Sequence, residues 1–300
     1  MNSFLFEQID KATDAILVTV LSTEGHSYKK QGDKALYVAG EPLPVYGNLG
    51  TTCVDPHIIK AGELARRNGK PTRISVDTTD PTDIHLGTGT YCGGRVDLLI
   101  EPILQTHKKI YRRARARLAD DEEVTIAHDM STGEINLTGP TNESNADTYV
   151  ETLRPASRLS IFGATPLARH IVRLLDDTDF SIHVSDWRAG YLSSLADLPR
   201  VTFHLDEWAV DAETYALVMS HSYERDLGSL RVAMAEGCRF VGLLSSRARR
   251  ERMFAELTSE GISSDALKNV MSPVGLPIHG RSDAEIALSI VAQLVEVKNR

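Results

Sequence analysis

Two cysteines stand in glycine-containing loops of the N-terminal half. Cys53 follows Gly47 and Gly50 and lies just before Asp55-Pro56, a pair that predicts the start of a helix. The partial positive charge of a helix N-terminus lowers the pKa of a nearby thiol, which favours a thiolate at Cys53. The alternative is that Cys53 is a small buried apolar residue.

The second loop runs from Gly87 to Gly94, contains Cys92 and leads into a predicted strand. Glycines beside the thiol would let a ligand approach the backbone and could present a nest of N–H groups to an anion. We therefore expect Cys92 to act with Cys53 at one site, although a buried structural cysteine also fits this loop. Cys238 precedes a core strand and is expected to be structural. The glycines expected to bind a ligand are Gly47, Gly50, Gly93 and Gly94.

The C-terminal half contains a variant of the dinucleotide-binding fingerprint. Gly163-Ala-Thr-Pro-Leu-Ala follows a predicted strand and opens a helix, and Asp186 ends the next strand. Thr165 replaces the glycine that lets a pyrophosphate reach the backbone, and Pro166 lacks the N–H that would help to hold it. Gly163 and Asp186 are candidate cofactor-binding residues. We expect NAD(P) to bind weakly, however, and Asp186 to have a mainly local role beside Arg188.

A group of polar residues follows the fourth strand of this half, in Met219-Ser-His-Ser-Tyr-Glu-Arg-Asp. His221 and Asp226 would lie at the carboxyl edge of a parallel sheet, where such proteins place ligand contacts, and could serve as acid, base or metal ligand. Capping of the next helix by Ser222 is the alternative explanation for part of this motif. The remaining histidines have no spacing typical of a closed zinc site.

The predicted elements divide the chain into two unlike halves. In the first half, strands are expected at 15–21, 34–38, 72–76, 95–103, 124–128 and 134–137, with a helix from Asp55. The polar segment 139–147 has little to bury and is predicted to be a linker or long loop. In the second half, strands at 159–162, 181–185, 201–204, 216–220 and 239–244 alternate with helices, and a capped helix follows Ser282. Right-handed crossovers then predict strand order 3-2-1-4-5.

Length and charge limit the class of protein. A chain of 300 residues predicts two domains, which we place at 1–148 (mixed α/β) and 149–300 (Rossmann-like, doubly wound and parallel). A net charge of -8 argues against general affinity for nucleic acid or anionic membrane. The basic segment 107–117 is interpreted as a solvated helix face. No secretory signal or membrane span is recognised, so a cytoplasmic protein is expected.

Four blocks of sequence, in order, resemble the XdhC/CoxI family of xanthine dehydrogenase and carbon monoxide dehydrogenase accessory proteins. The chain departs from the family in having Thr51-Thr-Cys-Val-Asp55 for Gly-Gly-Cys-Leu-Glu, and Thr165 in the fingerprint. The blocks are Tyr91–Pro102, Met219–Leu227, Phe240–Arg247, and Ser272–Ile278 with Ala284–Ile290.

The resemblance implies an accessory protein rather than an independent enzyme. It would bind molybdenum cofactor (molybdopterin) and support sulfuration and insertion of that cofactor into a xanthine dehydrogenase-type hydroxylase, with a cysteine desulfurase-type sulfur donor as second partner. A homo-oligomer, such as a homodimer, is also expected. Thiolates at Cys53 and Cys92 suit the soft molybdenum centre. Two alternatives stay open: an NAD(P)-dependent oxidoreductase, and an assembly partner that holds no cofactor.

Overall fold

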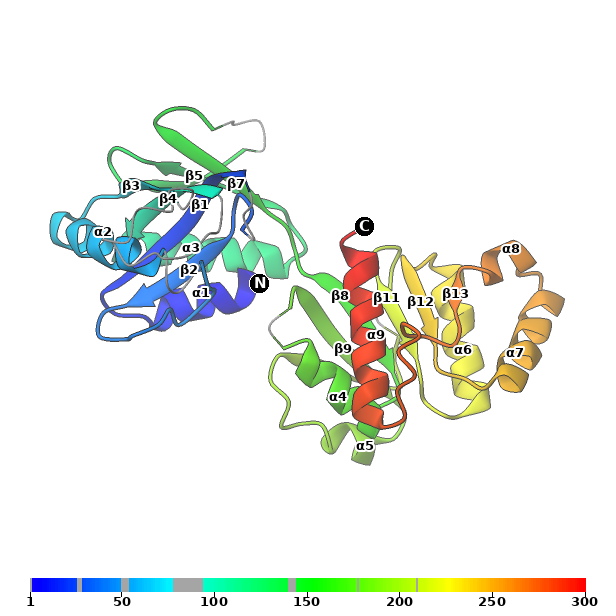
Figure 1. The fold of residues 1–300 in the computed structure, drawn as a ribbon. Coiled ribbons are helices and arrows are strands. Elements are labelled where there is room, and N and C mark those ends of the chain that lie inside the picture. Colours follow the sequence, from blue (N-terminus) through cyan, green and yellow to red (C-terminus); the bar gives the residue numbers. More distant parts are fainter. Residues whose placement is uncertain are drawn as a thin grey trace. The chain divides into compact units, whose positions relative to one another are not determined.

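The computed structural model separates the chain into two compact units, Met1–Pro155 and Ala156–Arg300. The residues that the structure describes are 2–25, 29–49, 54–77, 94–139, 144–176, 178–208 and 210–300. Within these ranges no helix is both long and apolar enough to cross a membrane. Each unit is described by itself below (Figure 1).

In its described residues, the N-terminal unit forms two antiparallel sheets and three helices (Figure 1). The larger sheet has order β2-β1-β4-β3 and contains β1 (Ala15–Gly25), β2 (Lys34–Val38), β3 (Thr72–Asp77) and β4 (Gly94–Pro102). The smaller has order β6-β5-β7 and contains β5 (Val124–Asp129), β6 (Ile135–Thr138) and β7 (Thr148–Leu153). The helices are α1 (Asn2–Lys11), α2 (Asp55–Asn68) and α3 (Gln105–Ala119).

Alternation along β1 divides the core of this unit into two layers. Ile16 and Val18 pack with residues of α2 on one face of the larger sheet. Leu17 packs on the opposite face, with residues of α1, α3 and the smaller sheet. Thr19 lies two residues after Leu17 in β1, so its side chain points to the same face as Leu17. This buried polar residue therefore lies in the layer between the two sheets.

Strand β7 was not expected from the sequence. It pairs with β5 along its whole length, from Thr148 opposite Asp129 to Leu153 opposite Val124. A boundary after residue 148 would separate this strand from its partner, and the two compact units instead divide between Pro155 and Ala156.

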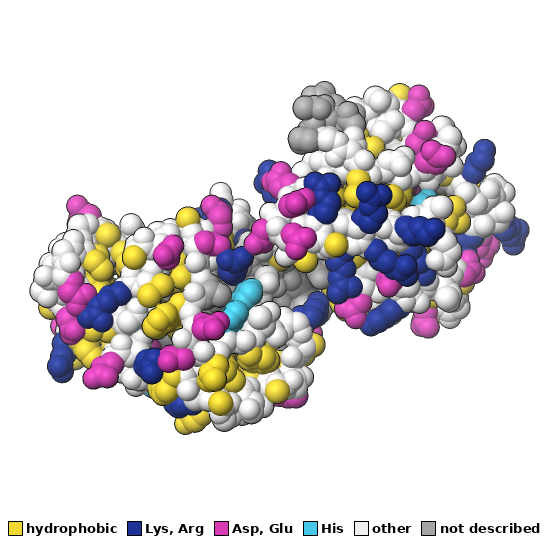
Figure 2. Space-filling view, turned by 180° about the vertical axis from the view of Figure 1, so that it is seen from behind, with side chains coloured by type: hydrophobic (Ala, Val, Ile, Leu, Met, Phe, Trp, Pro, Cys, Tyr) yellow, Lys and Arg dark blue, Asp and Glu magenta, His cyan; other side chains and the backbone are white. Residues whose placement is uncertain are grey.

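The basic segment forms helix α3, but only one side of that helix is solvated. His107 and Lys108 are buried, although their residue types suggest an exposed face. The Lys108 ammonium donates hydrogen bonds to the carbonyl oxygens of Asp10 and Ala12 at 3.0 and 2.5 Å, which satisfies the buried charge. The opposite side carries exposed arginines, and dark blue side chains gather on this unit in Figure 2.

The C-terminal unit is a doubly wound parallel α/β domain (Figure 1). Its six strands have order β10-β9-β8-β11-β12-β13, which confirms the predicted order and adds one edge strand. The strands are β8 (Ser157–Phe162), β9 (Phe180–Asp186), β10 (Val201–Leu205), β11 (Tyr215–Val218), β12 (Phe240–Leu243) and β13 (Val270–Met271).

Helices cover both faces of this sheet. On one face α4 (Pro166–Leu174) and α9 (Asp283–Lys298) pack against each other and the strands, and on the other lie α6 (Tyr223–Ala235) and α7 (Arg247–Ser259). Two short helices, α5 (Ala189–Ser193) and α8 (Ser264–Leu267), complete the unit. Ser282 caps α9 in a capping box with Glu285, as its position in the sequence predicted.

Candidate functional site

A pocket lies at the carboxyl edge of the parallel sheet, at the predicted switch point between β8 and β11. The space over it is about 280 Å³ when the open solvent at its mouth is counted, but the room inside it for a water-sized molecule is only about 20 Å³, so it is a shallow depression and does not enclose a ligand. The strand ends contribute the floor, and the first turns of α6 contribute one wall. The lining residues are Phe162, Gly163, Ser185, Asp186, Trp187, Asp206, Trp208, Ser220, Arg225 and Ser229.

The turn between β8 and α4 uses its own N–H groups internally. The Ala164 N–H donates to Asp186 Oδ2 at 2.9 Å, and the Thr165 N–H donates to the Gly163 carbonyl at 2.9 Å. The Thr165 hydroxyl caps α4 by accepting from the Ala168 N–H at 3.3 Å, and Pro166 has no N–H. The donors that would hold a pyrophosphate at this helix start are therefore largely engaged.

Both carboxylate oxygens of Asp186 accept hydrogen bonds from neighbouring residues. Its Oδ1 accepts hydrogen bonds from the backbone N–H and Nε of Arg188, at 2.9 and 2.8 Å. Its Oδ2 accepts from Arg188 Nη2 at 2.8 Å and from the Ala164 N–H. Burial would raise the pKa of Asp186, but these hydrogen bonds and the charge of Arg188 lower it. A carboxylate with both oxygens occupied in this way has little capacity left for ribose hydroxyls.

Gly163 serves the packing of the sheet edge. Its backbone has φ +122°, and a Cβ atom there would lie 2.6 Å from the Ser220 Cα. A side chain at this position would collide with the end of β11, so the glycine is required whether or not a ligand binds.

The walls of the pocket are aromatic and charged. Trp208 is 43% exposed, and its Nε1 donates to the Ser229 hydroxyl at 3.2 Å. The guanidinium of Arg225 lies 5.2 Å from the ring centre of Trp187 and pairs with the Asp206 carboxylate. These residues come from three separate loops or helices, and the sequence offered no spacing that would have grouped them.

The structure places His221 and Asp226 in different environments. Asp226 is buried, and its Oδ1 accepts from the Ser220 N–H at 2.9 Å and the Ser220 hydroxyl at 2.5 Å. Its Oδ2 accepts from Arg249 Nη2 at 2.7 Å. His221 is exposed, has φ +66°, and its carbonyl accepts from Arg249 Nη1 at 3.1 Å. Asp226 therefore positions the loop and Arg249, while His221 is an exposed residue whose carbonyl holds Arg249.

The cysteines expected to hold the cofactor, Cys53 and Cys92, lie outside the described residues, as do Gly50 and Gly93. Gly47 has φ +68°, and a Cβ there would lie 2.0 Å from the Lys34 carbonyl oxygen. Within the described ranges no three or more His, Cys, Asp or Glu side chains are arranged so that they could hold a metal ion.

The structure also places Gly94 and Ser222, two other residues named from the sequence. Gly94 begins β4 and pairs with Gly25. Ser222 is the N-cap residue of α6 by position, but within the described structure its hydroxyl makes no capping bond.

Burial, with the charge of Asp211, raises the pKa of the Cys238 thiol to about 11, so this thiol is protonated at neutral pH.

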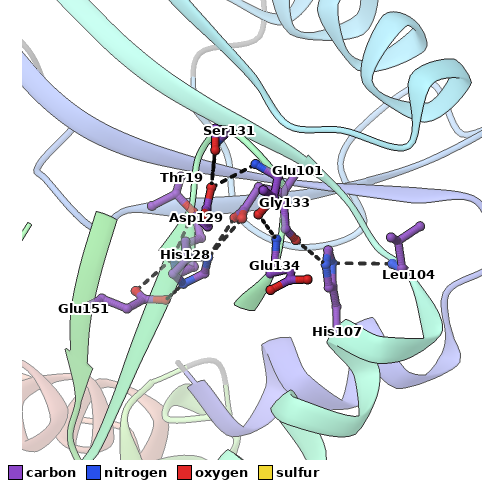
Figure 3. Close-up of polar contacts among 12 residues, drawn as sticks. Thr19, Glu101, Leu104, His107, His128, Asp129, Ser131, Gly133, Glu134 and Glu151 are labelled. Atoms are coloured by element: carbon purple, nitrogen blue, oxygen red, sulfur yellow. Dashed lines mark hydrogen bonds and ion pairs between the residues drawn. The ribbon is translucent and has the colours of Figure 1, made fainter. Parts of the chain in front are cut away.

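Sequence reasoning missed a buried charge cluster in the N-terminal unit. His128 of β5 lies between Glu101 of β4 and Glu151 of β7 (Figure 3). Its Nδ1 is 3.0 Å from both oxygens of Glu101, and its Nε2 is 3.1 Å from Glu151 Oε1. Lys34 Nζ is 2.9 Å from Glu151 Oε2 and also donates to the Thr19 hydroxyl at 2.9 Å.

Two cations and two carboxylates balance one another in this cluster. Burial would lower the pKa of His128, but the charge and hydrogen bond of Glu101, with those of Glu151, raise it to about 9. Burial would also raise the pKa of Glu151, yet Lys34 and His128 hold it at about 2. One sequence feature could have revealed this cluster: Glu101 directly follows the apolar run Leu98-Leu-Ile, where a buried ionisable residue needs a partner.

The chain is similar to known proteins along its whole length. A Bacillus subtilis relative, named as a probable subunit of xanthine dehydrogenase, is 25% identical over 97% of this chain and 96% of the relative. The Escherichia coli molybdenum cofactor insertion chaperone PaoD is 22% identical, over 98% and 87% of the two chains.

The fold of the whole chain is also found in a solved structure. A crystal structure described as a xanthine dehydrogenase from Bacillus halodurans superposes with a TM-score of 0.82 at 23% identity, and the match covers 99% of this chain and 96% of that one. Residues 159–294 match the family described as XdhC Rossmann domain. The resemblance to the XdhC family is therefore confirmed, and the C-terminal unit is an XdhC Rossmann domain.

Proposed function

We propose that this protein is an accessory protein of a xanthine dehydrogenase-type molybdenum hydroxylase. In this role it binds molybdenum cofactor and supports its sulfuration and its insertion into the hydroxylase. The observation that carries the proposal is a Rossmann unit that keeps a pocket at its carboxyl edge while the groups for a dinucleotide, at Thr165 and Asp186, are engaged internally. The names of the B. subtilis and E. coli relatives support the same role.

Molybdenum cofactor has three parts that a protein can recognise: a pterin ring, a phosphate and a metal–sulfur centre. The loops around the shallow carboxyl-edge pocket carry aromatic and polar side chains that can contact the ring. The proposal assigns the soft metal–sulfur centre to Cys53 and Cys92, because thiolates match it better than oxygen ligands. When bound, the cofactor supplies the centre that the hydroxylase uses, and this chain's own residues bind and orient it.

The remaining parts of the proposal concern partners and location. A cysteine desulfurase-type protein would donate the sulfur for the proposed sulfuration. The chain would act as a homo-oligomer such as a homodimer, and the work would take place in the cytoplasm.

Purification from a host that makes molybdopterin tests the proposal. We expect the protein to carry molybdenum and the absorbance of the cofactor, and to raise the activity of a co-expressed xanthine dehydrogenase-type hydroxylase. Activation without bound cofactor would favour the cofactor-free assembly partner. A protein that carries no cofactor, activates no hydroxylase and instead oxidises or reduces NAD(P) would support the oxidoreductase alternative.

A further inference from the structure

We propose that the outer face of helix α3 docks on an acidic surface of the hydroxylase. The inference rests on the proposed function for the identity of the partner, and it adds the surface of this chain and the charges that recognise that partner. Dark blue side chains gather on the N-terminal unit in Figure 2. The exposed cations that form the outer face are Lys109, Arg112, Arg113, Arg115 and Arg117.

Helix α3 carries these cations without any acid of its own, because no Asp or Glu occurs in its 15 residues. Arg112 and Arg117 are each paired with a carboxylate outside the helix. In the part of the chain that the structure describes, Lys109, Arg113 and Arg115 make no side-chain hydrogen bond or ion pair. The outer face therefore has guanidinium and ammonium donors left for carboxylates of another molecule.

The spacing of the unpaired cations is unfavourable for the helix alone. Lys109 and Arg113 are four residues apart, so they are neighbours on the helix surface, and like charges at this spacing destabilise a helix. A partner that places carboxylates over both side chains turns this repulsion into attraction.

Solubility does not account for these cations. The chain has a net charge of -8, so each cation brings the net charge closer to zero. This weakens the mutual repulsion that keeps copies of a protein apart. A helix face that served solubility in this chain would carry acids.

The outer face is presented on a firmly held helix. Tyr111 and Ala114, on the inner side of α3, are 2% and 0% exposed. His107 Nε2 lies 2.8 Å from the Gly133 carbonyl oxygen, and the Lys108 ammonium is bound to two further carbonyl oxygens. Because the backbone is already fixed, docking has to order only side chains, which lowers its entropic cost.

The charge pattern fits a folded protein better than nucleic acid or membrane. All the cations except Lys109 are arginines, which bind carboxylates through two parallel hydrogen bonds and are enriched at protein interfaces, where lysine is depleted. From Lys109 to Arg117 they span only about 12 Å of helix. The exposed acidic run Asp120–Glu123 follows directly, and it would repel a uniformly negative surface. A protein can place carboxylates against the helix and other groups against the acidic run.

Salt-dependent binding tests the proposal. The full-length protein is titrated against purified xanthine dehydrogenase-type hydroxylase by biolayer interferometry at about 50 and about 300 mM NaCl, a range over which exposed charges become screened. We expect the affinity of the wild type to fall by roughly tenfold at the higher salt concentration. Duplex DNA, phosphatidylglycerol vesicles and the cysteine desulfurase are measured in parallel and should bind more weakly.

Lys109→Glu/Arg113→Glu reverses two unpaired cations of the outer face. It should weaken binding to the hydroxylase by roughly ten- to a hundredfold, chiefly through slower association, and remove most of the salt dependence. The fold should persist, because a glutamate at position 113 lies four residues before Arg117, which is a favourable pairing. Thermal unfolding followed by circular dichroism checks this.

The matched control is Lys60→Glu/Arg67→Glu, which changes the net charge by the same amount. Both residues are exposed on α2 and make no ion pair within the described ranges. Helix α2 packs on the opposite face of the larger sheet from α3. The control should leave both the affinity and its salt dependence unchanged.

The proposal is overturned if the wild type does not bind the hydroxylase or binds DNA, vesicles or the desulfurase in preference to it. It is also overturned if Lys109→Glu/Arg113→Glu binds as well as the wild type, or if the control loses as much affinity. Failure of the accessory role gives a different result. If the α3 variant carries cofactor and activates the hydroxylase as the wild type does, the accessory role stands and the docking surface is lost. Salt-sensitive docking without cofactor or activation would do the reverse.

Discussion

Arg249 Nη2 lies 2.7 Å from Oδ2 of the buried Asp226 carboxylate. This ion pair joins the first turn of α6, which follows β11, to the first turn of α7, which follows β12. The same carboxylate accepts hydrogen bonds from the backbone and hydroxyl of Ser220, a pocket residue. The motif Met219–Asp226, in which the sequence suggested catalytic residues, therefore helps through Asp226 to shape the carboxyl edge of the sheet.

Asp226→Ala should destabilise the C-terminal unit by about 3 kcal/mol, because it leaves the Arg249 guanidinium and the Ser220 N–H without their buried acceptor. Denaturant unfolding, followed by circular dichroism, measures the change. The control is Asp197→Ala, whose carboxylate is 62% exposed in its ion pair with Arg169, and which should change stability by less than about 1 kcal/mol. Equal stability of Asp226→Ala and wild type would contradict the positioning role.

We expect the buried cluster to make the stability of the N-terminal unit sensitive to alkaline pH. The folded-state pKa of His128 is raised from 6.5 to about 9, so its stabilising contribution is complete below pH 6.5 and is lost as the pH rises to 9. The contribution is of order 3 kcal/mol. The pKa of Glu151 is lowered to about 2, so its contribution is complete above about pH 4.5 and is lost as the pH falls toward 2.

Glu101→Gln tests the origin of this shift. Removing one carboxylate should lower the pKa of His128 and move the alkaline loss of stability to lower pH. NMR titration of the imidazole and unfolding at pH 6, 7.5 and 9 (roughly the range of the shift) would follow both effects. Glu123→Gln, which alters an exposed carboxylate paired with Arg154, is the control. An unchanged pKa in Glu101→Gln would show that Glu101 does not hold the histidine charged.

NAD(H) should bind more weakly than about millimolar, since the turn before α4 has few free donors for a pyrophosphate. Thr165→Gly should improve any residual affinity, because it removes the methyl group and the hydroxyl cap. Calorimetry of both proteins measures this. Micromolar affinity of the wild-type protein would overturn the prediction.

Loss of a soft ligand typically weakens binding by roughly ten- to a hundredfold. We therefore expect Cys92→Ala to fold normally, to lose most co-purified molybdopterin and to fail to activate its hydroxylase. Cys53→Ala should be milder, because its loop departs from the family pattern. Cys238→Ala is the matched control and should retain both properties. A Cys53→Ala/Cys92→Ala protein with wild-type cofactor content and hydroxylase activation would establish both cysteines as structural.

Local pattern determined the elements and the class of the C-terminal unit. Alternation of strands with amphipathic helices predicted the parallel sheet and its order, because right-handed crossovers leave few other arrangements. The Ser282 cap was also predictable, since it depends on residues a few positions apart.

Only the tertiary structure decided which distant residues meet. Strand β7 became part of the N-terminal unit by pairing with β5, and this pairing placed Glu151 beside His128. Trp187 and Trp208 were brought to one pocket with Arg225 in the same way. Sequence periodicity specifies which face of an element is apolar, but partners far apart in the chain are chosen by sheet register and packing.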